Sequence, residues 1–431
     1  MEAGLFIFVV LLGLIFIGMP IAFALATSAT ITILIYETTS LLFQAKSIVT
    51  AVNSYPLLAV PLFILAGDLM YTGGLSRRLT AAIYAVVGSI RASLSYVTVI
   101  AATFFAAISG SAPATVAAIG TVMIPEMEKQ KYPTDYSAAL VAAAGMIGVM
   151  IPPSIPYVMY GVSSEESVAT LFMSGILPGL LFSVAYMVIA RLIYGQKKLE
   201  TPVKPFKWSE AITTFKDAFW AILAPVIVLG GIYGGIVSPT EAAAVSVFYA
   251  VLVGGVFYRE LTFKSFVETL GRSVGTIGMV LALVAFASTF GRILTLEQVP
   301  QQAGLLASTI SNNPLIILLL MNIALLIVGM FFETIAAIII LTPVLLPIAK
   351  QFGIDPIHFG TIMTINLAIG FCSPPFGVNL FVASAVTKLS IEQISRAIIP
   401  YFAGMLGLLA AITYIPEISL IIPRLLMGYA H

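Results

Sequence analysis

The chain has 431 residues, of which 60% are hydrophobic and only 9% carry a charge, and its mean hydropathy is +1.08. Soluble domains average about 25% charged residues, so this composition excludes a water-facing surface of ordinary extent. The net charge of +1 gives no indication of a nucleic-acid partner, and the single cysteine, Cys372, excludes an internal disulfide. Apolar runs of about 20 residues, the length that crosses a bilayer, follow one another from Leu5 to Leu426. The sequence therefore predicts an all-α polytopic membrane protein.

The first apolar run, Leu5 to Tyr36, lacks a charged leader and a small-residue cleavage site. We therefore expect it to be a membrane helix of the mature protein rather than a signal peptide. Asp68 follows within the apolar stretch PLFILAGDLM. Insertion scales put an aspartate at the bilayer centre at about 2.5–3.5 kcal/mol, so such a residue is expected to face polar interior.

A longer apolar run, Ser93 to Pro125, is broken in its middle by SGSAPAT, Ser109 to Thr115. Basic residues flank both ends, and the positive-inside rule places both flanks in the cytoplasm. The pattern predicts a re-entrant helical hairpin over 93–127, in which Ser109 or Ser111 caps the second arm and Pro113 lies in its first turn. The alternative for this motif is a small-residue surface for helix packing.

Two double prolines interrupt helical spans, in IPPSIPYVMYG (Ile151 to Gly161) and in CSPPFGVNLF (Cys372 to Phe381). Consecutive prolines remove backbone donors and leave upstream carbonyls unpaired. Within a membrane, such backbone is tolerated only where it is buried in protein or lines a cavity. Either site alone is explained equally well by a plain kink, but one in each half favours ion or substrate sites.

The interval 191–217 is the most polar part of the chain and is rich in lysine, so we predict a cytoplasmic linker between two halves, 1–190 and 218–431. KQKYPTDYSAAL and KQFGIDPIHFGT begin at Lys129 and Lys350, an offset of 350 − 129 = 221, and the double prolines keep nearly the same offset. Each half is predicted to contain an arm helix, a hairpin and a broken helix. These segments are 57–70, 93–127 and 137–161 in the first half, and 278–294, 315–348 and 358–385 in the second. The second hairpin, broken at GMFFET, has its flanks on the opposite face, which is typical of an inverted repeat in a secondary transporter.

Enzyme chemistry finds little support in the sequence. There is no G-x-x-x-x-G-K-[ST] loop for ATP, and the two histidines form no zinc motif and no Ser-His pairing. SPTEAAA, from Ser238, matches a capping box that ends at Glu241, so we interpret that acid as structural. We therefore predict a carrier and not an enzyme, with an intramembrane enzyme and a channel as the less favoured alternatives.

Taken together, VPLFILAGDLM, GSAPATVAAIGTVMIPEM, IPPSIPYVMYG, SPTEAAA and SPPFGVNLFVAS resemble the large membrane subunit of a tripartite ATP-independent periplasmic (TRAP) transporter. The resemblance implies membership of the ion transporter superfamily and sodium-driven import of an organic acid, such as sialic acid or a C4-dicarboxylate. It also implies a scaffold, an elevator transport domain, a separate four-helix small membrane subunit and a periplasmic binding protein in a bacterial inner membrane. The alternative is a stand-alone ion-coupled carboxylate carrier or antiporter.

The same resemblance implies the site. Leu57 to Met70 and Gly278 to Leu294 resemble the arm helices, which would put Asp68 on an arm and away from the ligands. No metal ion other than co-transported sodium is implied. The sodium and substrate region would comprise Ser109, Gly110, Ser111, Thr115, Pro152, Pro153, Ser154, Gly329, Glu333, Thr334, Ser373, Pro374, Pro375, Gly377 and Asn379.

Overall fold

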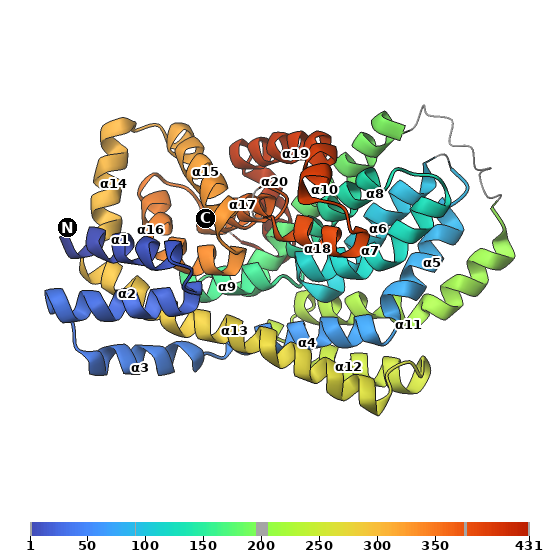
Figure 1. The fold of residues 1–431 in the computed structure, drawn as a ribbon, viewed down its shortest axis with the longest axis horizontal. Coiled ribbons are helices and arrows are strands. Elements are labelled where there is room, and N and C mark those ends of the chain that lie inside the picture. The colour runs from blue at the N-terminus through green and yellow to red at the C-terminus, as the bar shows by residue number, and fades with distance from the viewer. Residues whose placement is uncertain (1, 91, 195–205, 375–376, 430–431) are drawn as a thin grey trace.

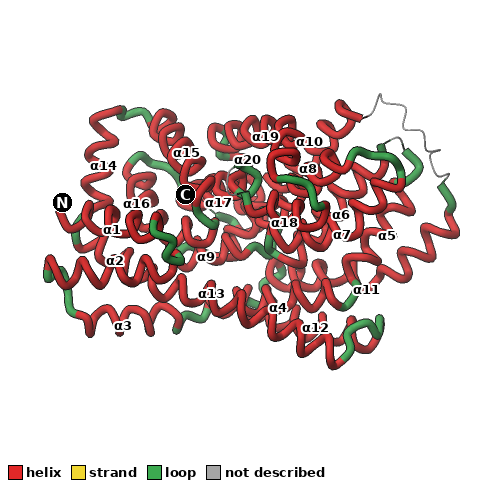
Figure 2. Tube along the Cα trace, viewed as in Figure 1, coloured by secondary structure: helices red, strands yellow, loops and turns green. Residues whose placement is uncertain are grey.

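The computed structural model describes residues 2–90, 92–194, 206–374 and 377–429, and every regular element within these ranges is a helix (Figures 1 and 2). The all-α prediction is therefore confirmed. The helices are α1 (Glu2–Phe16), α2 (Ile21–Tyr36), α3 (Leu41–Val52), η1 (Pro56–Leu58), α4 (Ala59–Thr72), α5 (Leu75–Val87), α6 (Ser93–Ser109), α7 (Ala112–Lys129), α8 (Thr134–Gly145), η2 (Met146–Val149), α9 (Ile155–Ser164), α10 (Val168–Tyr194), α11 (Trp208–Tyr233), α12 (Pro239–Leu252), η3 (Val253–Phe257), α13 (Phe263–Leu296), α14 (Val299–Ile310), α15 (Pro314–Phe331), α16 (Thr334–Gln351), α17 (Pro356–Gly370), α18 (Val378–Thr387), α19 (Ile391–Tyr414) and α20 (Glu417–Met427).

Within the described ranges, seven helices are long and apolar enough to cross a membrane. An eighth crossing results if the bent pair formed by α3 and the segment Pro56–Thr72, which meet at 59°, counts as one span. These lengths satisfy the requirement that a spanning helix cover the hydrocarbon core while satisfying its own backbone hydrogen bonds. The chain is thus a multi-pass membrane protein.

The N-terminal run differs from its prediction. Leu5 to Tyr36 was expected as one membrane helix, but the structure divides it into α1 and α2, which pack against each other. Gly18 adopts a φ of 89°, in the left-handed region, and Pro20 stands immediately before α2. Both residues oppose helix continuation, since glycine accepts the positive φ and proline supplies no backbone N–H.

Both ends of the predicted linker, 191–217, are helical in the described part of the chain. Helix α10 continues to Tyr194 and α11 begins at Trp208, so 208–217 is helical despite its polar composition. Residues 195–205 lie outside the described part of the chain. The predicted arm 57–70 corresponds to η1 and α4, whereas 278–294 is only the later part of the 34-residue helix α13. No proline interrupts α13, and in Figure 1 it runs along the lower side of the molecule, where it packs against α2, α3, α4 and α16.

The helices on either side of the linker match in length and spacing. Helices α7 and α16 have 18 residues each and begin 222 positions apart, at residues 112 and 334. Helices α9 and α18 have 10 residues each and begin 223 positions apart, at residues 155 and 378. The packing is reciprocal, because α7 contacts α18 while α16 contacts α9. Each half therefore contributes the neighbour of the other half's short helix, as in two repeats related by a pseudo-two-fold axis.

Candidate functional site

The first helix break lies between α6 and α7. Gly110 ends α6 in the left-handed region, with a φ of 62°. Ser111 is the N-cap of α7, and its Oγ accepts a hydrogen bond from the backbone N–H of Ala114, so Ser111 rather than Ser109 is the capping serine. The hydroxyl of Ser109 lies 3.0 Å from that of Thr115, which in turn donates to the carbonyl of Ser111 (2.8 Å). Three hydroxyls are thereby held at one turn.

This turn rests on the first broken helix. The carbonyl of Gly110 accepts a hydrogen bond from the N–H of Ile155 (3.2 Å), and a Cβ at Gly110 would lie 2.6 Å from the carbonyl oxygen of Pro153. Ser154 is fully buried and caps α9, since its Oγ accepts from the N–H of Tyr157 (3.4 Å) and donates to the carbonyl of Val149 (2.6 Å). The backbone of the Pro152-Pro153 segment, whose peptide bond is cis, is thus enclosed by protein, the condition for a broken membrane helix.

The second helix break lies between α15 and α16, where Glu333 is the N-cap. Its Oε2 accepts hydrogen bonds from the N–H groups of Ile335 (2.9 Å) and Ala336 (3.1 Å). Thr334 is fully buried and its hydroxyl is 3.4 Å from the carbonyl of Leu367 on α17. Gly329 lies against Gly370, with no space for a side chain at Gly370 because the Gly329 backbone fills it. The second break therefore packs against α17.

The second broken helix joins the two halves directly. Asn379 is fully buried near the start of α18, and its Nδ2 donates to the carbonyl of Ala142 on α8 (2.9 Å). Its Oδ1 has no hydrogen-bond partner among the described residues. Gly377 is the N-cap of α18, and the hydroxyl of Ser373 donates to the carbonyl of Ile369 (3.1 Å). Pro374 is exposed, and Pro375 lies outside the described residues.

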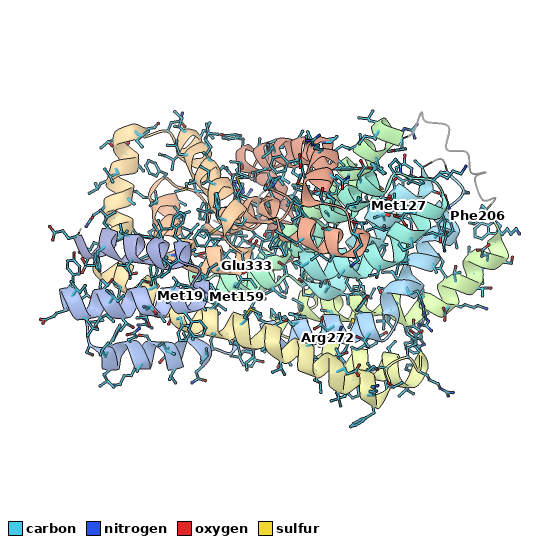
Figure 3. All side chains as sticks on the ribbon, viewed as in Figure 1. Met19, Met127, Met159, Phe206, Arg272 and Glu333 are labelled. Carbon is cyan, nitrogen blue, oxygen red and sulfur yellow. The ribbon has the colours of Figure 1, made fainter. Side chains whose placement is uncertain are left out.

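A cavity of about 520 Å³ lies where the two breaks meet, near the centre of the molecule, where Figure 3 labels Glu333. Of the residues predicted for the site, Ser109, Gly110, Ser111 and Glu333 line it, while Thr115, Ser154, Thr334 and Asn379 are buried in the elements around it. The remaining lining residues are Pro20, Ile21, Ala22, Ile64, Gly67, Asp68, Ala112, Pro113, Ala114, Val149, Ile155, Pro156, Thr276, Met279, Val280, Leu283, Ile335, Ala336 and Phe371.

The wall formed by α2, α4 and α13 was missed by the sequence analysis. Asp68 lines the cavity, although its position on an arm had been taken to place it away from the ligands. Its Oδ2 accepts a hydrogen bond from the hydroxyl of Ser273 on α13 (2.6 Å). The signal that marks it in the sequence is an acid in an apolar stretch, which in a membrane usually faces a polar interior.

The chemistry available in this cavity is that of hard oxygens and helix termini. The hydroxyls of Ser109 and Ser111 and the carboxylates of Asp68 and Glu333, all of which line the cavity, are oxygen ligands suited to a hard cation. The N-termini of α7, α9 and α16 contribute lining residues, and a helix N-terminus favours an anion by about 0.3–2 kcal/mol. Among the described residues, no group of three His, Cys, Asp or Glu side chains could hold a metal ion. The cavity therefore suits a small hard cation and an anion together.

Comparison with known families decides what this architecture is. The model of the family described as "Tripartite ATP-independent periplasmic transporter, DctM component" matches residues 8–418. The chain belongs to this TRAP transporter family. The family resemblance found in the sequence is thereby confirmed, and the chain is a component of a membrane transporter.

Named relatives are similar to this DctM component over most of its length. The isethionate TRAP transporter permease protein DctMQ of Oleidesulfovibrio alaskensis is 46% identical over 94% of this chain, but this chain spans only 64% of that relative. The sialic acid TRAP transporter large permease protein SiaM of Vibrio cholerae is 39% identical, with 97% of this chain and 98% of the relative covered. The C4-dicarboxylate TRAP transporter large permease protein DctM of Pseudomonas aeruginosa is 42% identical, with 93% and 94% covered.

Among solved structures, the fold of this DctM component is similar to that of the Alcanivorax borkumensis YdaH transporter. The TM-score is 0.66, with 90% of this chain and 89% of that chain covered, at 14% sequence identity. At this identity the likeness concerns the fold alone. The same helical arrangement therefore occurs in that protein.

Proposed function

We propose that this DctM component carries out sodium-coupled import of an organic acid across a bacterial inner membrane by an elevator motion. In this proposal α4 and α13 act as arms that join a scaffold to a moving domain containing the two helix breaks. A separate small membrane subunit completes the scaffold, and a periplasmic binding protein delivers the acid. Sodium ions bind at the breaks and are transported with the substrate.

The observation that carries this proposal is the cavity shared by the two breaks. Ser111 and Glu333 begin α7 and α16 from opposite halves of the chain, yet both line one cavity of about 520 Å³. Broken helices that meet at one site are how many secondary transporters place a substrate between helix N-termini and cations at unwound carbonyls.

The substrate class is inferred from the relatives. Their names include sialic acid, C4-dicarboxylates, 2,3-diketo-L-gulonate and isethionate. All of these are anions near neutral pH, with a carboxylate or a sulfonate group. We therefore propose an acid whose anionic group is held at the helix N-termini of the cavity, where oriented N–H groups favour negative charge.

Reconstitution tests the proposal. The chain is placed in proteoliposomes with its small subunit and the cognate binding protein, and uptake of radiolabelled sialic acid, succinate, 2,3-diketo-L-gulonate and isethionate is followed. We expect one of these acids to accumulate only when there is an inwardly directed sodium gradient and the binding protein is present. Accumulation in sodium-free buffer at a clamped potential contradicts sodium coupling. Accumulation without the binding protein supports a stand-alone carrier instead.

A further inference from the structure

The charged groups of the central cavity all have the same sign. Asp68 and Glu333 line it, and among the described lining residues none is a lysine, an arginine or a histidine. The acid proposed as substrate is itself an anion, so its entry would place a third negative group in this cavity. Like charges that line one cavity repel, and pairing or neutralising one of them removes the repulsion.

The carboxylate of Asp68 lies near a hydroxyl donor and a cationic side chain. Its Oδ2 accepts a hydrogen bond from Ser273, and Arg272 lies within electrostatic range of the carboxylate. The guanidinium of Arg272 is held on this side of the cavity, because its Nη2 is within 3.5 Å of the hydroxyls of Thr72 and Thr269. Asp68 therefore belongs to a set of polar side chains that contact one another between α4 and α13.

Glu333, by contrast, is stabilised by helix N–H groups and not by a cationic side chain. No ion pair in the described part of the chain includes Glu333, and Figure 3 shows Arg272 well away from it. The side chain is exposed to the cavity rather than enclosed by packing. Its hydrogen-bond partners in the described part of the chain are the N–H groups of Ile335 and Ala336, both of which donate to Oε2.

These two N–H groups are also the ones that an anion would use. A helix N-terminus binds a carboxylate through its free N–H groups. At α16 the carboxylate of Glu333 already occupies them, whereas at α7 the corresponding N-cap is the neutral Ser111. Glu333 therefore acts against an incoming anion in two ways, by its charge and by its occupation of the N–H groups.

We propose that Glu333 is the charge-coupling residue of the cavity, where a monovalent cation, sodium or a proton, neutralises its carboxylate each time the substrate anion binds. This inference rests on the proposed function and assigns one of the transported cations to one side chain. When Glu333 is neutralised it no longer repels the anion, and the N-terminus of α16 becomes available to it.

The test compares the wild type with Glu333→Gln and Glu333→Asp in the reconstituted complex, using whichever of the four acids the wild type accumulates. Initial uptake is measured against sodium concentration, and the charge moved per substrate is obtained from the potential at which net flux is zero. We expect Glu333→Gln to lower the sodium Hill coefficient and the charge per substrate by about one each, since a neutral amide needs no counter-ion. Glu333→Asp keeps the charge and is expected to keep the wild-type stoichiometry.

Two outcomes of this experiment distinguish sodium from a proton as the neutralising cation. If sodium neutralises Glu333, the Hill coefficient falls as stated at every pH. If a proton does so, the Hill coefficient is unchanged, and the wild type takes up one proton per substrate that Glu333→Gln does not. An unchanged charge per substrate in Glu333→Gln, with no loss of proton uptake, overturns the inference.

Glu241→Gln is the matched control. Glu241 also accepts a backbone N–H at the start of a helix, that of Ser238 at α12, but it does not line the cavity. The substitution makes the same change of charge and is expected to leave the charge per substrate unaltered. If the wild type shows no sodium-dependent uptake, the proposed function is refuted. If the wild type shows it and Glu333→Gln moves the same charge and the same ions per substrate, only the role of Glu333 is refuted.

Discussion

Ser154 and Asn379 are both fully buried at the short helices that follow the broken segments. The hydroxyl of Ser154 caps α9 and also donates to the carbonyl of Val149, so it fixes the backbone oxygens next to the first break. Asn379 uses its Nδ2 on Ala142 and keeps Oδ1 without a described partner. A buried amide oxygen without a donor is unfavourable by about 1–3 kcal/mol, which a bound cation would offset.

At this scale we predict that Ser154→Ala and Asn379→Ala each raise the sodium concentration needed for half-maximal uptake by several-fold. The first loosens oxygens at the break, and the second removes an oxygen directly. Sodium titrations of uptake measure the effect, and size-exclusion chromatography checks that the variants fold. Ser238→Ala, which removes the serine of the confirmed capping box at α12, is the matched control and should leave the sodium titration unchanged. Unaltered titrations in both site variants would disprove these assignments.

At the scale of helices, the breaks are held in place by close backbone approaches. Gly370, at the end of α17, lies against the backbone of Gly329. In the other half Gly148 lies against Ser111, and a Cβ added at Gly148 would be 2.6 Å from the carbonyl oxygen of Ser111. The two positions are 222 residues apart, the same offset as between α7 and α16. Only glycine permits such contact, so each half has a glycine where its helix break rests on the broken helix.

We predict that Gly370→Ala lowers the thermal unfolding midpoint of the purified protein, because an added methyl group must displace the Gly329 backbone. Overpacking of this kind is unfavourable by about 1–3 kcal/mol. Gly407→Ala on α19 is the control, since a Cβ there meets no atom within 4 Å and alanine favours a helix. Equal midpoints for Gly370→Ala and wild type would show that the second break tolerates movement away from α17.

At the scale of the whole molecule, the elevator proposal requires α16 to move past α13. In this structure the two helices pack together, and a Cβ at Gly291 would lie 4.0 Å from the Cβ of Pro343. That separation is within the range of about 3.5–4.5 Å found in disulfides. Cys372 is the single native cysteine, so a pair of introduced cysteines can be followed without interference once it is replaced.

We predict that Gly291→Cys with Pro343→Cys, in a Cys372→Ser background, forms a disulfide under oxidation and stops transport, and that reduction restores it. The cross-link would fix α16 to the arm and prevent the relative motion. Uptake before and after oxidation measures the effect, with each single-cysteine variant as a control for oxidation itself. Full transport by the cross-linked protein would show that the two helices do not move relative to each other during the cycle.

The positions of the helix breaks could be predicted from the sequence because they depend on local backbone chemistry. Serine is favoured at an N-cap, as at Ser111, and proline in a first helical turn, as at Pro113, while Gly110 accepts the left-handed conformation that ends a helix. The division of Leu5 to Tyr36 at Gly18 and Pro20 depends on the same chemistry. It was missed because the whole run is apolar, and hydropathy alone does not show where a helix turns.

What the sequence by itself determined is the membrane class and the places where helices stop, since composition and backbone preference act on neighbouring residues. The family came from the resemblance of its motifs. Only the tertiary structure decided which groups meet: Asn379 with the carbonyl of Ala142, 237 residues away, and Asp68 with the cavity it had been placed outside. The neighbours of a side chain depend on how distant helices pack, and an apolar sequence leaves many packings equally compatible with its pattern.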